Sequence, residues 1–327
     1  MRELILAADI GGTKADMGLF SVRDGHLIIE RISSAPTTSY GSAMSLLDTF
    51  LLMDAPKLKA ACIGIAGPVI DEAAVAPNLP WNVSLSQLKK SLETDKVELL
   101  NDLVATAYGI ADLKEDNLVV LQAGEPSSTG AKALIAPGTG LGEAVLIDGK
   151  PLPSEGGHAD FAPGNEIEID LLKYMVHKHE THISWEKVAS GPGLQEIYDF
   201  VLNTGLASST PTTIQKLASM DPSSVVATEA MECSDEACRM ALNIFISILG
   251  AEAGNLALKS LSTGGVFIGG GIPPKILPAL KSGAFMERFT SKGRMEKLLR
   301  QIPVSVITEP RTALYGAAAR AMQLITD

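Results

Sequence analysis

The feature that most constrains the fold is an apolar strand, a glycine-containing turn and a second strand, an arrangement that occurs twice in the chain. Residues 4–8, 9–14 and 15–22 form the first copy, and residues 133–136, 137–142 and 144–147 form the second. A further apolar run, 265–268, ends in Gly269-Gly270-Gly271. Glycine turns at three strand ends predict two related α/β halves around a shared cleft.

Strand-like and helical patterns alternate between the two copies. Apolar runs typical of buried strands cover residues 60–65 and 97–100, and helical spacing of apolar residues covers 42–53, 86–93 and 105–112. Strands separated by helices indicate an α/β layer structure. A length of 327 residues suggests about two domains of ordinary size.

Composition narrows the class of protein. The chain is 46% hydrophobic and 20% charged, which is typical of a soluble globular protein, and it has no run of about 18 uncharged apolar residues to span a membrane. Three cysteines are too few for a disulfide framework, and the acidic start is unlike a signal peptide, so we expect a reducing cytoplasm. A net charge of −11 argues against sequence-independent nucleic-acid binding.

The glycine turns are suited to phosphate groups. Successive backbone N–H groups in such turns form concave anion sites. The first turn is not a P-loop and the second is not a dinucleotide fingerprint, because a strand follows each of them. Asp9 could hold a metal ion through water, and Thr13, Lys14 and Thr139 add donors, so the set predicts a clamp for Mg-bound phosphates. For any turn alone, a tight hairpin remains the simpler explanation.

A second group of polar residues suits a polyhydroxylated ligand. Asn101-Asp102 follows a buried run, Glu155 and His158 lie among glycines, and Glu186 precedes Ser190-Gly191-Pro192-Gly193, where Ser190 could cap a helix. Two other interpretations stay open. Asp102 could serve only as a helix N-cap, and His158 with Glu155 could bind a metal, although further zinc ligands are missing nearby.

Taken in order, these motifs resemble those of the bacterial hexokinase-like glucokinases of the sugar-kinase/actin/Hsp70 superfamily. The motifs are DIGGTKADMGLF (9–20), GIAGPV (64–69), LLNDLVATAYGI (99–110), PGTGLG (137–142), EGGHADFAP (155–163), SGPG (190–193) and GGVFIGGGI (264–272). A related repressor/kinase family carries a Cys-rich zinc motif after the E-x-G-H element. Here FAPGNEIEID occupies that place, so we expect no zinc.

The resemblance implies two RNase H-like (actin-like ATPase) domains around a central cleft. The expected small domain covers residues 1–112 plus 308–327, the large domain covers 113–307, and a C-terminal helix at 311–325 returns to the small domain. The resemblance also implies that the protein is a cytoplasmic glycolytic enzyme, a homodimer that uses glucose, ATP and Mg²⁺ and binds neither nucleic acid nor membrane.

The resemblance further assigns roles to individual residues. Asp102 is expected to be the general base that takes the proton of the glucose 6-hydroxyl as it attacks the γ-phosphorus of ATP. The sugar is expected to contact Asn101, Asp102, Glu155, His158 and Glu186. The nucleotide is expected to contact Asp9, Gly11, Gly12, Thr13, Lys14, Gly138, Thr139, Gly140, Gly269, Gly270 and Gly271.

Alternatives remain beside glucokinase activity. A broader hexokinase, or a kinase of another hexose or amino sugar, would share these motifs, and ADP or polyphosphate could replace ATP as donor. A sugar-sensing regulator without turnover is a different class. Such proteins usually add a helix-turn-helix domain, for which a first strand beginning by Leu4 leaves no room.

Overall fold

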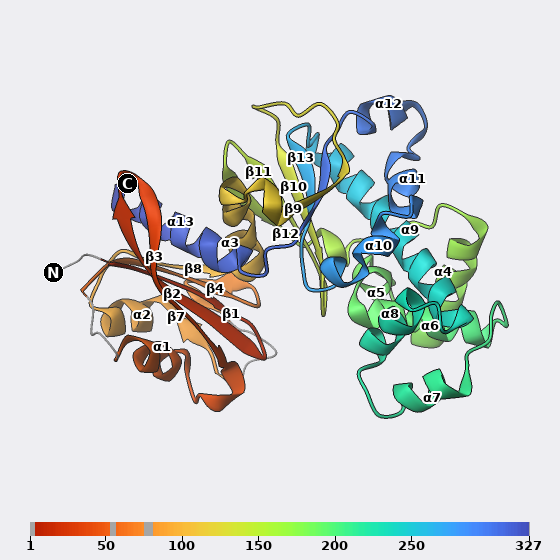
Figure 1. Ribbon diagram of the computed structural model, residues 1–327, viewed down its shortest axis with the longest axis horizontal. Coiled ribbons are helices and arrows are strands. Elements are labelled where there is room, and N and C mark those ends of the chain that lie inside the picture. The colour runs from red at the N-terminus through yellow and green to blue at the C-terminus, as the bar shows by residue number, and fades with distance from the viewer. Residues whose placement is uncertain (1–3, 53–56, 75–80, 327) are drawn as a thin grey trace. The chain divides into compact units, whose positions relative to one another are not determined.

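The computed structural model describes residues 4–52, 57–74 and 81–326 (Figure 1). Contacts between Cα atoms divide the chain into two compact units. Unit 1 comprises Met1–Lys114, Gly149–Leu152 and Glu309–Asp327, and unit 2 comprises Glu115–Asp148 and Pro153–Thr308.

Unit 1 is built on a mixed sheet with the strand order β3-β2-β1-β4-β8. The strands are β1 (Leu4–Ile10), β2 (Lys14–Arg23), β3 (His26–Pro36), β4 (Leu58–Ile65) and β8 (Val97–Asn101). Strands β1 and β2 form the predicted hairpin, while β1, β4 and β8 run parallel. The carboxyl ends of three parallel strands therefore meet at one edge, where Asp9 and Asn101 lie. A small sheet of β5 (Val69–Ile70), β6 (Ala73–Ala74) and β7 (Val83–Ser84) is separate.

Helices cover both faces of the unit 1 sheet because β1 is apolar on both sides. Leu6, Ala8 and Ile10 belong to one buried cluster together with residues of α1 (Ala43–Leu51) and α2 (Leu85–Leu92). Ile5 and Ala7 point to the other face and join α3 (Asp102–Gly109) and α13 (Thr312–Thr326). Alternate residues of a strand face opposite sides, so a continuous apolar run produces a strand buried on both faces.

Helix α13 packs closely against α3, although some 200 residues separate them in the chain (Figure 1). A Cβ on Gly316 would overlap the carbonyl oxygen of Ala105, and one on Gly109 would overlap that of Thr312. The missing side chains let the two backbones approach each other. The final helix is thereby fixed on the helix that begins at Asp102.

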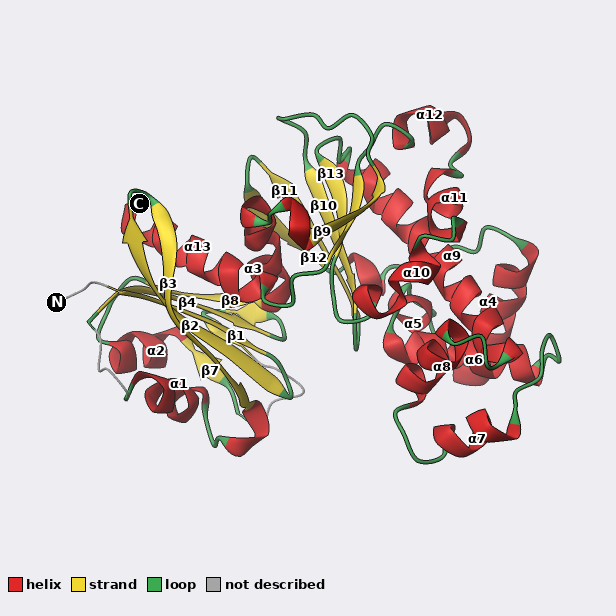
Figure 2. Ribbon diagram, in the orientation of Figure 1, coloured by secondary structure: helices red, strands yellow, loops and turns green. Residues whose placement is uncertain are grey.

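The six-stranded sheet repeats the strand order of unit 1 in its first five strands. It runs β12-β11-β10-β13-β14-β9, shown as yellow strands in Figure 2, and it belongs to unit 2 except for Lys150–Leu152 of β12. The strands are β9 (Leu118–Gln122), β10 (Lys132–Pro137), β11 (Leu141–Ile147), β12 (Lys150–Ser154), β13 (Gly265–Ile268) and β14 (Val304–Ile307). The β10–β11 hairpin is antiparallel, and β13 and β14 continue in parallel, as β4 and β8 do in unit 1. The prediction of two related α/β halves is confirmed at the level of the fold.

Helix α9 (Glu236–Ser260) contacts most other helices of unit 2. They are α5 (Glu186–Ala189), α6 (Gly191–Asn203), α8 (Pro222–Met231), α10 (Leu277–Leu280), α11 (Ala284–Thr290) and α12 (Glu296–Leu299). Helix α4 (Glu166–His179) packs on α6, and α7 (Pro211–Leu217) packs on α8. By length and composition α9 is apolar enough to cross a membrane, but most of it is buried in the protein core. It is the central core helix of this unit.

Short 3₁₀ helices occupy several connections. They are η1 (Thr37–Ser39), η2 (Ile110–Asp112), η3 (Glu115–Asn117), η4 (Gly156–His158), η5 (Pro273–Ile276) and η6 (Gly293–Met295). The segment that starts at Pro273 begins as η5 and continues into α10, because consecutive prolines cannot donate the hydrogen bonds of a regular helix.

Candidate functional site

The glycine turn of unit 1 is a braced loop between β1 and β2. The Gly11 N–H donates to the Lys14 carbonyl at 2.9 Å. Thr37 holds the turn from outside: its N–H donates to the Thr13 carbonyl at 3.0 Å, and its hydroxyl donates to the Gly11 carbonyl at 2.9 Å. Thr37 is fully buried, whereas Thr13 and Lys14 are exposed. The donors expected to contact phosphate therefore sit on a fixed backbone and face solvent.

Three carboxylates cluster beside this turn. Asp9 lies opposite Asp16 in the β1–β2 ladder and beside Gly64 of β4. Asp16 accepts the Ser34 hydroxyl and forms an ion pair with Lys14 at 2.9 Å. Burial, then the negative charges of Asp102 and Asp16, raise the pKa of Asp9 to about 7, and Lys14 opposes this. Such a site is favourable for a cation, because positive charge would stabilise the ionised form of Asp9.

Asn101, not Asp102, caps helix α3. The Asn101 Oδ1 accepts from the N–H groups of Leu103 and Val104 at 2.9 and 3.3 Å, while its Nδ2 donates to the Gly67 carbonyl at 3.0 Å. The interpretation of Asp102 as the N-cap is wrong. Asn101 keeps the extended backbone of β8, as a cap residue requires, and Asp102 is the first helical residue.

Asp102 is consequently not needed as the helix cap. Its Oδ1 accepts from the Leu103 N–H at 2.9 Å, a donor that Asn101 also contacts. Burial raises its pKa above the usual range, and hydrogen bonds from Leu103 and Asn101 act against that rise. A half-buried carboxylate at a helix N-terminus, with a raised pKa, is typical of acid–base groups in active sites.

The glycine turn of unit 2 is held by Glu186. Within the turn, the Gly138 N–H donates to the Gly140 carbonyl at 2.8 Å. The Glu186 Oε2 accepts the Leu141 N–H at 3.0 Å, and the Gly138 carbonyl accepts the Gly191 N–H at 2.8 Å. Glu186 begins α5 and Gly191 begins α6, for which Ser190 is the cap, as the sequence predicted. Thr139 lies at the tip of this turn.

Three of the expected sugar contacts come together in unit 2. His158 Nε2 lies 3.8 Å from Glu155 Oε2, and His158 Nδ1 lies 3.9 Å from Glu186 Oε1. The side chains of Glu155 and His158 are 81% and 61% exposed, while that of Glu186 is 33% exposed. Polar groups this open remain available to a ligand, and their mutual ion pairs add little stability.

Backbone pairing brings these three residues together. The Trp185 N–H donates to the Ala159 carbonyl at 3.0 Å, and Asp160 forms a β-bridge with Ser184. Gly157 packs on Leu141, where a Cβ would overlap the carbonyl oxygen. The loop with Glu155 and His158 is therefore fixed both to the segment carrying Glu186 and to the start of β11. Among the described residues, no group of three or more His, Cys, Asp or Glu could hold a metal ion.

The third glycine turn lies against the second. The Gly269 N–H donates to the Ile135 carbonyl at 2.9 Å. Gly270 has a φ of 86° and touches Pro137, where a Cβ would overlap the carbonyl oxygen, whereas Gly271 has open space around it. The positive φ and the contact with Pro137 explain why glycine is required at position 270. The structure thus brings 269–271 and 138–140 together in unit 2.

Sequence reasoning missed two residues that support these turns. Thr37 braces the first turn from 26 positions away, and nothing in its local sequence signals this. Glu143 is almost fully buried on β11, and its carboxylate lies against Gly156. An acid inside the apolar run LGEAVLI was a signal that could have found it.

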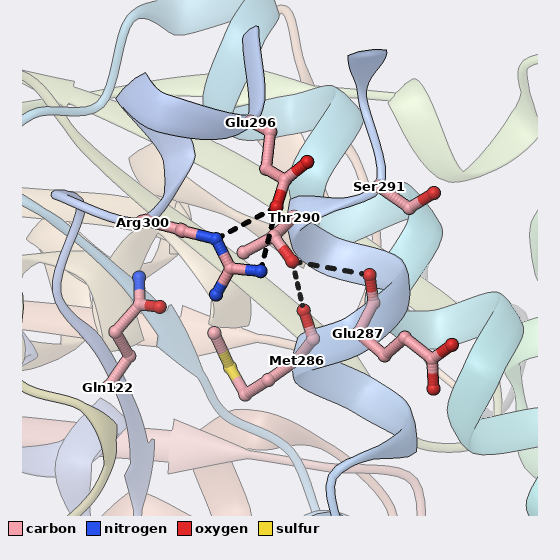
Figure 3. Close-up of a pocket in the computed structure, with 7 residues that line it drawn as sticks. All are labelled: Gln122, Met286, Glu287, Thr290, Ser291, Glu296 and Arg300. Carbon is pink, nitrogen blue, oxygen red and sulfur yellow. Dashed lines mark hydrogen bonds and ion pairs between the residues drawn. The ribbon is translucent and has the colours of Figure 1, made fainter.

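A separate pocket of about 340 Å³ in unit 2 contains none of the predicted site residues (Figure 3). Its Arg300 is paired with Glu296 at 2.7 and 2.9 Å, and Gln122 donates to the carbonyls of Leu299 and Ile302. These polar groups are already satisfied by the protein, so the pocket has no feature that indicates a ligand.

Known proteins resemble the chain over nearly its full length. A family model described as glucokinase matches residues 6–324. The glucokinase of Nostoc punctiforme is 40% identical, with 98% of this chain and 99% of that protein covered. A crystal structure of glucokinase from an Antarctic psychrotroph has a TM-score of 0.86 and 32% identity, covering 99% of this chain and 100% of the other.

A more distant structure shares the fold. It is a ROK family glucokinase from Streptomyces griseus in complex with glucose and AMPPNP, with a TM-score of 0.66, 21% identity, and coverage of 98% and 99% of the two chains. The α/β fold with its mixed sheets is thus that of solved glucokinase structures. With the family model and full-length relatives in agreement, the chain belongs to the glucokinase family.

Proposed function

We propose that this protein transfers the γ-phosphate of ATP to the 6-hydroxyl of glucose, giving glucose 6-phosphate and ADP, with Asp102 as the general base. The observation that carries this proposal is the division of labour at the start of α3. Asn101 caps the helix, which leaves the half-buried Asp102 carboxylate for chemistry. Membership of the glucokinase family supports the sugar-kinase reaction and the substrate.

Asp102 would accept the proton that the 6-hydroxyl loses as its oxygen attacks the γ-phosphorus. Phosphoryl transfer depends mainly on positioning and charge stabilisation, and the protein base receives the hydroxyl proton. A general base is most effective when its pKa lies near the working pH, and burial shifts the pKa of Asp102 in that direction. The Asn101 amide donates to the Gly67 carbonyl and also hydrogen-bonds to the Asp102 carboxylate, which holds that carboxylate at the start of α3.

Glu155, His158 and Glu186 would bind the remaining sugar hydroxyls. Carboxylates accept hydrogen bonds from hydroxyl groups, and an imidazole can both donate and accept hydrogen bonds. These three side chains therefore match the hydroxyls of a sugar. Glu186 also holds the Gly138–Gly140 turn through the Leu141 N–H. One side chain would therefore connect sugar binding with the backbone that faces phosphate.

The nucleotide would be held by three turns: Gly11, Gly12, Thr13 and Lys14 in unit 1, and Gly138–Gly140 and Gly269–Gly271 in unit 2. Mg²⁺ would enter with ATP and neutralise phosphate charge during transfer. Asp9 fits the role of a water-mediated ligand, because its carboxyl is surrounded by negative charge that a cation would offset. We propose that units 1 and 2 are the small and large domains of the expected kinase fold.

We also propose that the protein is a cytoplasmic homodimer and acts in glycolysis.

The sugar and the phosphate donor are tested by a coupled assay of glucose, mannose, fructose, glucosamine and N-acetylglucosamine, each with ATP, ADP and polyphosphate. Glucose with ATP is expected to give the highest kcat/KM. A higher kcat/KM for another sugar or donor would contradict the proposed substrate. Binding of glucose without turnover would contradict the proposed enzyme and would indicate a sugar sensor.

A further inference from the structure

Glu143 is a buried carboxyl for which the proposed reaction has no use. It is the third residue of β11 and is 1% exposed. No hydrogen-bond donor in the described part of the chain reaches its Oε1. Burying an ionised carboxylate without donors is very unfavourable, so the uncharged form is expected to prevail.

A second buried carboxylate, Glu252 of α9, faces Glu143. Its oxygens already have partners: Lys259 Nζ donates to Oε1 at 3.1 Å and Asn255 Nδ2 donates to Oε2 at 2.7 Å. Asn255 in turn accepts from Lys292 at 2.6 Å. Glu252 is thus stabilised as the charged member of the pair, and a protonated Glu143 can donate a hydrogen bond to it.

Electrostatics agree with this assignment. Burial, and then the charge of Glu252, raise the pKa of Glu143 to about 7, Lys259 lowers it, and the hydrogen bond to Glu252 raises it further. Glu252 and Lys259 are the charged groups that act on Glu143, and Lys292 reaches the same turn of α9 through Asn255 and the Ala251 carbonyl.

Glu143 also touches the loop that carries two expected sugar contacts. A Cβ on Gly156 would overlap the Glu143 Oε2, and the Gly156 N–H is fixed by the Ser154 hydroxyl at 3.0 Å. Gly156 lies between Glu155 and His158. The carboxyl of Glu143 therefore forms the surface on which this loop rests.

We propose that Glu143 is a positioning residue for sugar binding: its uncharged carboxyl, hydrogen-bonded to Glu252, supports Gly156 and so sets the positions of Glu155 and His158. This inference rests on the proposed function. Ionisation of Glu143 would place two negative charges side by side in the core and loosen the loop above them. The sugar site would then weaken as pH rises through the pKa of Glu143.

The first test compares Glu143→Gln with Glu143→Ala. The amide is uncharged, has nearly the same shape and can donate to Glu252, so E143Q should keep the glucose KM within about twofold at pH 7, while E143A should raise it about tenfold. The kcat should fall less than KM rises, because Glu155 and His158 bind substrate and transition state alike. Equal KM values for wild type, E143Q and E143A would overturn the inference.

The pH profile separates positioning from mere stability. Between pH 6 and 9 the glucose KM of the wild type should rise about threefold or more relative to that of E143Q. The two proteins differ only at position 143, so the ratio of the two profiles isolates Glu143. Parallel profiles would contradict the shared proton. Glu229→Gln is the matched control: Glu229 is also a buried glutamate of unit 2, paired with Lys216, and its loss should lower thermal stability without moving the glucose KM.

A double-mutant cycle tests the contact itself. Gly156→Ala should raise the glucose KM, because the added methyl group collides with Glu143, and removing that side chain in the G156A/E143A double variant should restore part of the affinity. Strictly additive effects would refute the contact. Wild-type turnover of glucose in the same assay checks the proposed function independently, so that failure of the reaction is distinguishable from failure of the inference.

Discussion

Gly140 and Glu186 are in such close contact that a Cβ added to Gly140 would lie 2.5 Å from the Glu186 Oε2. The same oxygen accepts the Leu141 N–H, while Oε1 lies 3.9 Å from His158 Nδ1. One carboxylate therefore links the phosphate-type turn of unit 2 to the loop expected to bind sugar.

Gly140→Ala should displace Glu186 and weaken both substrates together. The expected result is a rise of about tenfold in KM for glucose and for ATP, since one side chain serves both loops. Steady-state kinetics with each substrate varied in turn would measure this. Gly41→Ala is the matched control, because a Cβ there meets nothing within 4 Å. A change in only one KM would contradict the link.

Asp102→Asn should lose catalysis while gaining stability. Removal of the general base is expected to lower kcat about 10²- to 10⁴-fold. Because burial raises the pKa of Asp102, its ionised form is unfavourable in the folded state, and a neutral amide should raise the melting temperature at pH 7. Single-turnover kinetics and thermal unfolding would test both. Near-normal turnover would refute Asp102 as the base.

Asn101→Ala should lower the stability of the protein, in contrast to Asp102→Asn. The change removes the N-cap of α3 and the tie to Gly67, so we expect a loss of about 1–2 kcal/mol in the free energy of unfolding. Urea denaturation of this variant beside Asp102→Asn would show which residue is the cap. Equal stability of Asn101→Ala and wild type would contradict the assignment.

Asp9 should make stability depend on pH. Its pKa is about 7 in the folded protein against 3.8 for an ordinary aspartate, so the folded state binds more protons than the unfolded state between these values. The contribution of Asp9 to the free energy of unfolding is then fully present below pH 4 and is lost as pH rises towards 7. Asp9→Asn should remove this loss, and its advantage in unfolding free energy should grow by about 2–4 kcal/mol from pH 4 to pH 7. A constant difference across that range would contradict the pKa.

Removal of Mg²⁺ should stop turnover without unfolding the protein. We assign the ion to the nucleotide and not to a structural site, so EDTA should abolish phosphorylation and leave the melting temperature unchanged. Added Mg²⁺ should restore activity. A large drop in melting temperature with EDTA would show a structural metal instead.

The sequence predicted those parts of the fold that depend on local pattern. The apolar runs at 4–8, 133–136 and 265–268 are strands, and glycine turns follow them where predicted. The cap at Asn101 was not predicted, because Asn and Asp are about equally good N-caps and lie side by side. Only the backbone of Asn101, extended as the last residue of β8, decided between them.

For the candidate site, the sequence named residues and the tertiary structure supplied their partners. The motifs containing Glu155, His158 and Glu186 were visible as polar groups among glycines, but that His158 lies between the two carboxylates depends on the pairing of Ala159 with Trp185. The brace at Thr37 had no signal in the sequence, and the acid at Glu143 stood out in its apolar run, but its pairing with Glu252 did not. Residue type and spacing determine which segments become strands, helices and turns, because those preferences are local. Burial, pKa and contact between distant residues arise only when packing brings them together and excludes water.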